Sequence, residues 1–237
     1  MSLHLPKSLL DFPREQLTHP MMDEQISADN LNHVDIDMQF LGQVLICFDA
    51  EETAYIKAVG NVHLFPDCIE RYGDRLFIGA KNIGSLFRKI YHSKLIMELH
   101  LPEHCNVNIT FVAGAVALFG GTGAVSVKGA FGEVAGLSYS QNAVIQVSCG
   151  TVSLIELQGT ADIRIGFGST EIGLSKTSGR EQMRIRCGVG SIELTVDPQD
   201  APESDHGGFF KNKRIVTPSG ASIESSVGIG AIEAMYG

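Results

Sequence analysis

The chain has 237 residues, of which 44% are hydrophobic, and its formal net charge at pH 7 is −9. This length and hydrophobic content are enough for a sizeable buried core, and they exclude an acidic disordered chain. No apolar run approaches the roughly 20 residues that span a bilayer, so we expect no membrane span. The negative charge predicts no nucleic-acid partner, because phosphate neutralisation needs clustered Lys and Arg.

Residues 1–34 show no clean hydrophobic period, and we expect them to form an irregular N-terminal arm or cap. The start, MSLHLPKSLLDFPREQ, has no basic region followed by a long apolar stretch, so no secretory signal is visible. The five cysteines are not closely paired, which is typical of reduced thiols. We therefore expect a cytoplasmic protein, or an extracellular one if a signal has been removed.

From Asn106 the sequence repeats every nine residues. The units are NVNITFVAG, AVALFGGTG, AVSVKGAFG, EVAGLSYSQ, NAVIQVSCG, TVSLIELQG, TADIRIGFG and STEIGLSKT. Apolar residues alternate within each unit, as in a β-strand with one buried face, and a final Gly suits a tight corner. A β-meander would explain the alternation but not a fixed period over eight units. The repeat therefore predicts stacked equivalent strands whose like side chains form ladders through a thin core.

The fold class that we expect is all-β. It is a single-stranded, right-handed β-solenoid (β-helix) of strand–turn units of about nine residues, covering residues 35–237, with its first coils less regular. Coils of 18 and of 27 residues fit the units equally well. The pattern resumes at residues 190–196 and again at 229–234. Between these copies, residues 197–220 are polar and rich in Pro and Gly, and they are predicted to form a loop extruded from the solenoid.

The stretch LIMELHLP at 95–102, followed by NVNI at 106–109 and short G-x-V-x-V units, resembles the DUF4097/DUF2807 group of adhesin-like domains. The segment GDRLFIG at 73–79 is in the same style, and the similarity covers roughly residues 45–237. The resemblance implies a β-solenoid and an adhesin-like role. It carries over no catalytic residues.

The glycine-rich segment 114–134 contains GGTGAV, which is close to a phosphate-binding loop. A dinucleotide fingerprint needs a third Gly where Ser126 stands, and a helix where the strand-like AVSVKGAFG follows. Lys128–Gly129 also has the wrong order for a P-loop. Val125 replaces the Asp of calcium-binding β-roll repeats. We interpret these glycines as turn residues.

Other chemical motifs are weak. His100 and His104 bracket a proline beside Cys105, which argues against a helical zinc pair, although His63 or His92 could complete a metal site. The contiguous Ser204, Asp205 and His206 cannot form a catalytic relay. Two thiols at inward or corner positions, Cys149 and Cys187, are expected to be buried and inert. Three glutamates at equivalent positions are interpreted as ordinary outward residues, with an acidic line as the alternative; they are Glu171, Glu193 and Glu233.

We assign no catalytic, cofactor-binding or metal-binding residue from the sequence. The inward positions are used for packing, which predicts a non-catalytic structural or interaction module. Because solenoid ends expose unpaired edges, we expect a self-associating scaffold that forms a homo-oligomer. An adhesin-like surface-binding module is the alternative, and a polysaccharide-acting β-helix enzyme is a weaker one.

Overall fold

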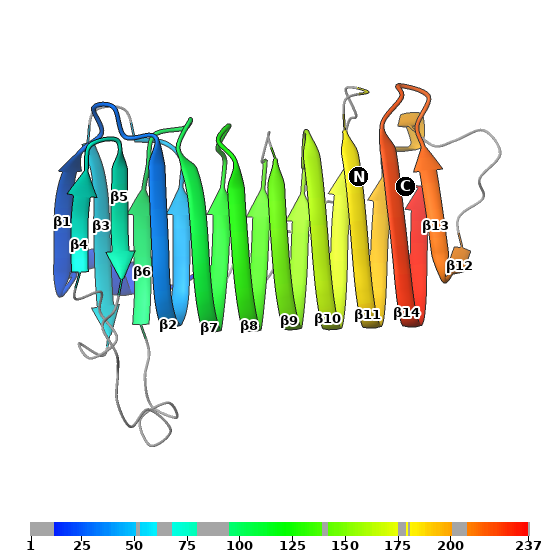
Figure 1. Cartoon of the computed structure of the whole chain (residues 1–237), viewed down its shortest axis with the longest axis horizontal. Helices are drawn as coiled ribbons and strands as arrows, with labels where there is room; N and C mark the ends of the chain where they lie inside the picture. Colours follow the sequence, from blue (N-terminus) through cyan, green and yellow to red (C-terminus); the bar gives the residue numbers. More distant parts are fainter. Residues whose placement is uncertain are drawn as a thin grey trace, which may run out of the picture.

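The protein is described by a computed structural model at residues 12–50, 53–60, 68–79, 95–138, 142–174, 179, 181–200 and 208–236. Over these residues it is an all-β solenoid whose fourteen strands form one long mixed sheet. Figure 1 shows the strands standing side by side along the long axis. Within the described ranges, short 3₁₀ helices are present at η1 (Arg14–Thr18) and η5 (Pro198–Asp200). Among these described residues, no helix is long and apolar enough to cross a membrane.

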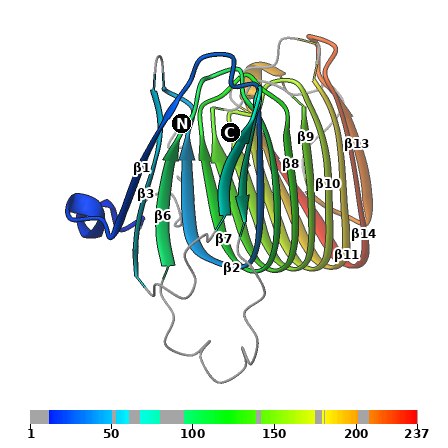
Figure 2. The ribbon, with the colours of Figure 1, turned by 60° about the vertical axis from the view of Figure 1, so that its left-hand side comes forward.

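Seven long strands form the regular stack, and each bends at its middle. They are β2 (His33–Cys47), β7 (Asn106–Phe119), β8 (Val125–Leu137), β9 (Ala143–Ile155), β10 (Thr160–Leu174), β11 (Gln182–Val196) and β14 (Ser222–Tyr236). Both halves of a strand pair in parallel with the same halves of the next. The halves before the bend make one layer, here the first face, and the halves after it make the second face. Figure 2 shows the bends aligned along the lower side.

The register decides the coil length that the sequence left open. Val107, Val125, Ala143 and Ala161 are successive partners, so one coil takes 18 residues, or two of the nine-residue units. Later coils are longer, because extra residues lie between the strands and not within them. Ala161 pairs with Met183, and Met183 pairs with Ile223.

The core is a set of aliphatic ladders between the two faces. One buried ladder on the first face is Ile36, Ile109, Val127, Ile145, Ile163 and Ile185. One on the second face is Val44, Val116, Val134, Val152, Thr170, Ile192 and Ile232. β-Branched side chains suit these positions because they pack well on a pleated surface. The predicted ladders of like side chains through a thin core are confirmed.

From β7 to β14, the bend is made by a column of glycines, one in each long strand. They are Gly114, Gly132, Gly150, Gly168, Gly190 and Gly230, with φ between 139° and 158°. A Cβ atom at Gly150 would lie 1.7 Å from the carbonyl oxygen of Gly132, and Gly168 has the same relation to Gly150. The backbones therefore approach so closely that only glycine fits this position.

At the N-terminal end the two faces are extended separately. On the second face, β6 (Leu95–His100) pairs with β2 in parallel, and β3 (Thr53–Gly60) and β1 (Met22–Ser27) follow antiparallel. On the first face, β5 (Arg75–Gly79) pairs with β2 in parallel and β4 (Cys68–Tyr72) follows antiparallel. These strands replace the less regular coils that the sequence predicted. Part of the predicted N-terminal arm is β1 itself, whereas residues 1–11 lie outside the described chain.

At the C-terminal end the segment predicted as an extruded loop contains strands. β12 (Gly208–Phe210) and β13 (Asn212–Val216) pair antiparallel with the second and first halves of β14. The description of residues 197–220 as a loop is therefore wrong for these eight residues. Because β14 would otherwise present a row of unpaired backbone groups, the segment folds back onto that edge and closes it.

Candidate binding groove

An open groove runs along the solenoid where the first face meets the bend. It encloses about 1060 Å³ and extends from β7 to β14; we call it the axial groove. Its floor is made of small residues, among them Ala130, Ser148, Gly166 and Gly188. A Cβ atom at Gly166 would lie 2.5 Å from the carbonyl oxygen of Ser148. Gly166 is therefore required by the close approach of the Ser148 backbone, and the floor of the groove carries only small side chains.

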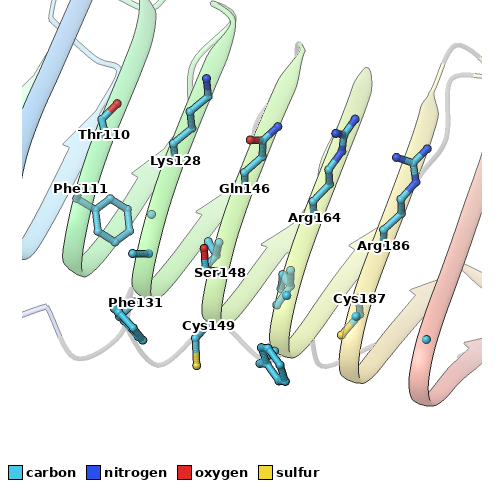
Figure 3. Close-up of a pocket in the computed structure, with 18 residues that line it drawn as sticks. Thr110, Phe111, Lys128, Phe131, Gln146, Ser148, Cys149, Arg164, Arg186 and Cys187 are labelled. Carbon is cyan, nitrogen blue, oxygen red and sulfur yellow. The ribbon is translucent and has the colours of Figure 1, made fainter.

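One wall of the groove is a polar and cationic row. The row consists of Thr110, Lys128, Gln146, Arg164 and Arg186, which are successive partners in neighbouring coils. Figure 3 shows the side chains of this row in line on successive strands. Neighbouring strands lie about 4.8 Å apart. Arg164 and Arg186 are therefore one strand spacing apart, and Lys128 and Arg164 are two, or about 10 Å.

The other wall is an apolar ridge on the bend. Phe131, Cys149 and Phe167 are successive partners, and the two phenylalanines are 59% and 60% exposed. Figure 3 shows Phe131 and Cys149 at the bend, below the cationic row. Exposed phenyl rings in register are unusual for a solvated surface, because burying them would remove a large apolar area from water. The groove thus has an aromatic wall opposite a cationic one.

The cationic row creates a positive surface on an acidic chain. Arg164 forms an ion pair with Asp162 at 2.6 Å, and its hydrogen bonds hold the pKa of Asp162 below the usual range, aided by the charges of Arg186 and Arg184. Within the described part of the chain, neither Lys128 nor Arg186 has a carboxylate at ion-pair distance. Their charges therefore remain available to an anionic ligand.

The second face has the opposite charge. Glu171, Glu193 and Glu233 are successive partners in β10, β11 and β14, so these residues form the acidic line that the sequence left as the alternative. Burial raises the pKa of Glu193, and the charges of Glu171 and Glu233 raise it further. The molecule therefore has an acidic row on one face and a cationic row on the other.

The residues singled out in HLPEHC do not gather into one site. Cys105 is buried and donates to the carbonyl oxygen of Leu31 at 3.0 Å, and burial raises its pKa to about 12. His104 is exposed. His100 instead contacts Asp49 and Glu98, at 2.5 and 3.3 Å. The other candidate ligands and the Ser-Asp-His run lie outside the described residues; they are His63, His92, Ser204, Asp205 and His206.

The two thiols expected to be buried differ. Cys187 is buried, and burial raises its pKa. Cys149 is exposed on the apolar ridge, so the expectation of a buried thiol is wrong there. Cys149 directly precedes Gly150 at the bend, where its neighbours in register, Phe131 and Phe167, also face solvent.

The GGTG run of the glycine-rich segment is a turn, as predicted, whereas Gly129 lies within β8. Residues 120–124 connect β7 to β8, and Gly120 and Gly121 have φ of 74° and 97°. The amide of Thr122 donates to the carbonyl oxygen of Glu103 at 2.8 Å. The strand that follows begins at Val125, so the helix that a dinucleotide site requires is not there.

Comparison of the chain with family models, curated proteins and solved structures finds no match. The candidate site therefore rests on the geometry of the groove. Sequence reasoning missed it because the chain was divided every nine residues, which mixes the two faces. Division every 18 residues from Thr110 places Lys128, Gln146 and Arg164 in one column, and this signal was present in the sequence.

Proposed function

We propose that the chain is a non-catalytic binding module whose axial groove holds an extended acidic polysaccharide. The observation that carries the proposal is the pairing of a cationic row with an aromatic ridge along one open groove. Lys128 and Arg186 would pair with carboxylate or sulfate groups, and Arg164 would add to the positive potential while paired with Asp162. Phe131 and Phe167 would contact the sugar rings. This is the adhesin-like alternative, with the ligand class added.

The composition of the groove favours binding over catalysis. Its described lining residues include Lys, Arg, Gln, Ser, Thr and Cys but neither a carboxylate nor a histidine. Hydrolysis of a glycosidic bond ordinarily uses a pair of carboxylic acids beside the scissile bond. The lining therefore supports a binding module over a glycoside hydrolase.

The test compares two double variants that change the net charge equally. Arg164→Gln/Arg186→Gln removes charge from the groove, and Lys57→Gln/Arg75→Gln removes it from β3 and β5. Binding to polygalacturonate and to heparin is measured by calorimetry at two salt concentrations, with neutral dextran as the control ligand. We expect the groove variant to bind at least tenfold more weakly and with a smaller salt dependence, because fewer charged contacts remain.

Phe131→Ala/Phe167→Ala is expected to weaken binding without changing the salt dependence, since it removes apolar contact only. Equal losses in the two charge variants would mean that binding follows net charge and not the groove. The absence of binding to either acidic polymer would also reject the proposal.

Self-association stays a prediction, but the C-terminal edge of the solenoid is not free for it. β12 and β13 occupy the edge of β14, so end-to-end stacking there would require their displacement. At the other end, β1 has one neighbour in the described sheet and carries Asp23 and Glu24. Charged residues on an edge strand oppose pairing. Light scattering over a range of concentrations tests this, and a monomer throughout would reject the scaffold hypothesis.

A further inference from the structure

A second cluster of chemically active side chains lies on the outer side of the second face, where β2 and β6 end. Cys47 in β2 and His100 in β6 are direct partners in the parallel pairing of these strands. Asp49 follows Cys47 by two residues, which places both on the same side of an extended chain. Figure 1 shows β2 and β6 side by side. One ligand atom from each of these three residues lies within 4.8 Å of the other two.

The imidazole of His100 is held in place from several sides. Its Nδ1 lies 2.5 Å from Oδ1 of Asp49, and its Nε2 lies 3.3 Å from Oε1 of Glu98. The ring stacks on Tyr55 of β3, with centroids 4.1 Å apart and an interplanar angle of 17°. The side chains of His100 and Glu98 are 13% and 12% exposed, whereas that of Asp49 is 59% exposed. One side of the cluster is therefore packed and the other faces water.

We infer that Cys47, Asp49 and His100 form a binding site for a divalent transition-metal ion of the zinc type. A thiolate, an imidazole and a carboxylate are ligands that Zn²⁺ accepts together, and three protein ligands leave one position for water. The open position would lie on the exposed side, next to Asp49. From the imidazolium form of His100, binding replaces the proton on Nδ1 while Nε2 keeps its own, and it also replaces the thiol proton of Cys47; both displaced protons pass to solvent.

Glu98 places a carboxylate behind the metal-binding imidazole of His100. When Nδ1 coordinates the metal, Nε2–H can donate to the Glu98 carboxylate. A carboxylate behind a metal-bound histidine fixes the tautomer and the ring orientation and makes the imidazole a better ligand. Glu98 is thus a positioning residue. The inference is independent of the axial groove, which lies on the first face and at the bend.

The experiment uses the full chain, reduced and freed of metal by a chelator. Co²⁺ is titrated first, because thiolate coordination produces a charge-transfer band in the near ultraviolet. The Zn²⁺ affinity is then measured by competition with a chromophoric chelator. We expect one equivalent of metal, with the thiolate band. We also expect Cys47→Ser to lose the band, and His100→Gln and Asp49→Asn each to weaken binding at least tenfold. Glu98→Gln is expected to weaken binding about 10–100-fold.

The matched controls are Cys149→Ser and His104→Gln, which remove an exposed thiol and an exposed imidazole outside the cluster. Both should bind metal as the unchanged chain does. Circular dichroism of the metal-free variants checks folding, and Asp49→Asn serves if the more buried substitutions unfold the chain. The inference is overturned if no equivalent binds, if binding survives Cys47→Ser and Asp49→Asn, or if a control variant abolishes it.

Discussion

The regular coils and the two ends of the molecule use opposite kinds of strand pairing. From β7 to β11, every strand is parallel to its neighbours and in register, so each side chain meets its equivalents in the coils on both sides. At the ends, the outermost strands β1, β4, β12 and β13 are shorter and antiparallel to their neighbours. A parallel repeat does not terminate itself, because each added coil exposes another unpaired edge. The antiparallel strands at the two ends, which are not part of the repeat, cover those edges.

The regular coils and the ends should differ most in the loss of stability that a Gly→Ala substitution causes. In the coils, a Cβ atom at Gly168 would lie 1.7 Å from the carbonyl oxygen of Gly150, and φ is 143°. In the β4–β5 hairpin, Gly73 has φ of 62° but nothing within 4 Å of such an atom. We expect Gly168→Ala to lower the free energy of unfolding by about 4 kcal/mol or more. Gly73→Ala should lower it by about 1–2 kcal/mol, the penalty for a left-handed backbone conformation.

Urea denaturation followed by circular dichroism measures both variants. Failure of Gly168→Ala to fold, beside a folded Gly73→Ala, would agree with the prediction. Similar small losses in the two variants would show that neighbouring coils can separate at the bend, and the glycine column would lose its structural role.

The next prediction concerns side-chain packing between neighbouring coils. The ring of Phe111 fills the space over Gly129, where a Cβ atom would lie 2.4 Å from the ring, and the next partner in that ladder is Val147. Phe111→Ala should cost about 3–5 kcal/mol because it leaves a cavity. Gly129→Val alone should also destabilise, by overlap with the ring.

The double variant Phe111→Val/Gly129→Val would extend the branched aliphatic pair Val147 and Ile165 of this ladder through both coils. We expect it to be more stable than the sum of the two single changes by about 1–3 kcal/mol, a coupling that a double-mutant cycle measures directly. Additive effects would mean that the two positions do not share one packing space.

The repeat explains why the coils could be predicted from the sequence. Val107, Val125 and Ala143 occupy a fixed column because each faces the same environment, and such a column is visible without a structure. The number of units per coil was not visible, because units on the two faces have the same alternation. The C-terminal strands were missed because NKRIV, between polar segments, is too short to show a period. Ile215 is buried because β13 pairs with the edge of β14, and this pairing cannot be read from the local sequence.

The axial groove and the proposed metal site also differ in how far the sequence could reveal them. Arg164 and Arg186 belong to the repeat, and reading one face at a time would have revealed their row. Cys47 and His100 have no repeat to reveal them, since they are brought together by the pairing of β2 with β6 across the intervening chain. Pairing between non-repeating strands depends on the whole fold and not on a local pattern.

A smaller effect is expected from detaching β13, which covers the edge of β14 at the C-terminal end. Ile215 in β13 is 1% exposed and pairs with Ile223 of β14, whereas the next residue, Val216, is 50% exposed. Ile215→Asp places a charge in the core, which should detach β13 at a cost of about 2–3 kcal/mol and free the first-face edge of β14. We expect larger species in light scattering from this variant. Val216→Asp is the matched control and should leave the mass unchanged, and equal behaviour of the two variants would contradict a capping role for β13.

The smallest effect tests a disadvantage of pairing in register, which places like charges directly opposite one another. The pKa of Glu193 is raised by burial and by Glu171 and Glu233, so the folded state binds its proton more tightly than the unfolded state does. The stability that comes from this proton is fully present below the ordinary glutamate pKa. It is lost as the pH rises through the raised value.

Glu193→Gln should therefore be slightly more stable than the unchanged chain at pH 7, by about half a kcal/mol or less because solvent screens the row. The two proteins should converge near pH 4, where the carboxyl group is protonated. Glu224 on the opposite face is the control, since it lies 3.5 Å from Arg184 and 3.8 Å from Arg214. Glu224→Gln should leave stability at pH 7 unchanged or lower it. If urea denaturation shows that both substitutions destabilise equally at pH 7, the glutamate row is not repulsive. In that case, stacking in register carries no electrostatic penalty on the second face.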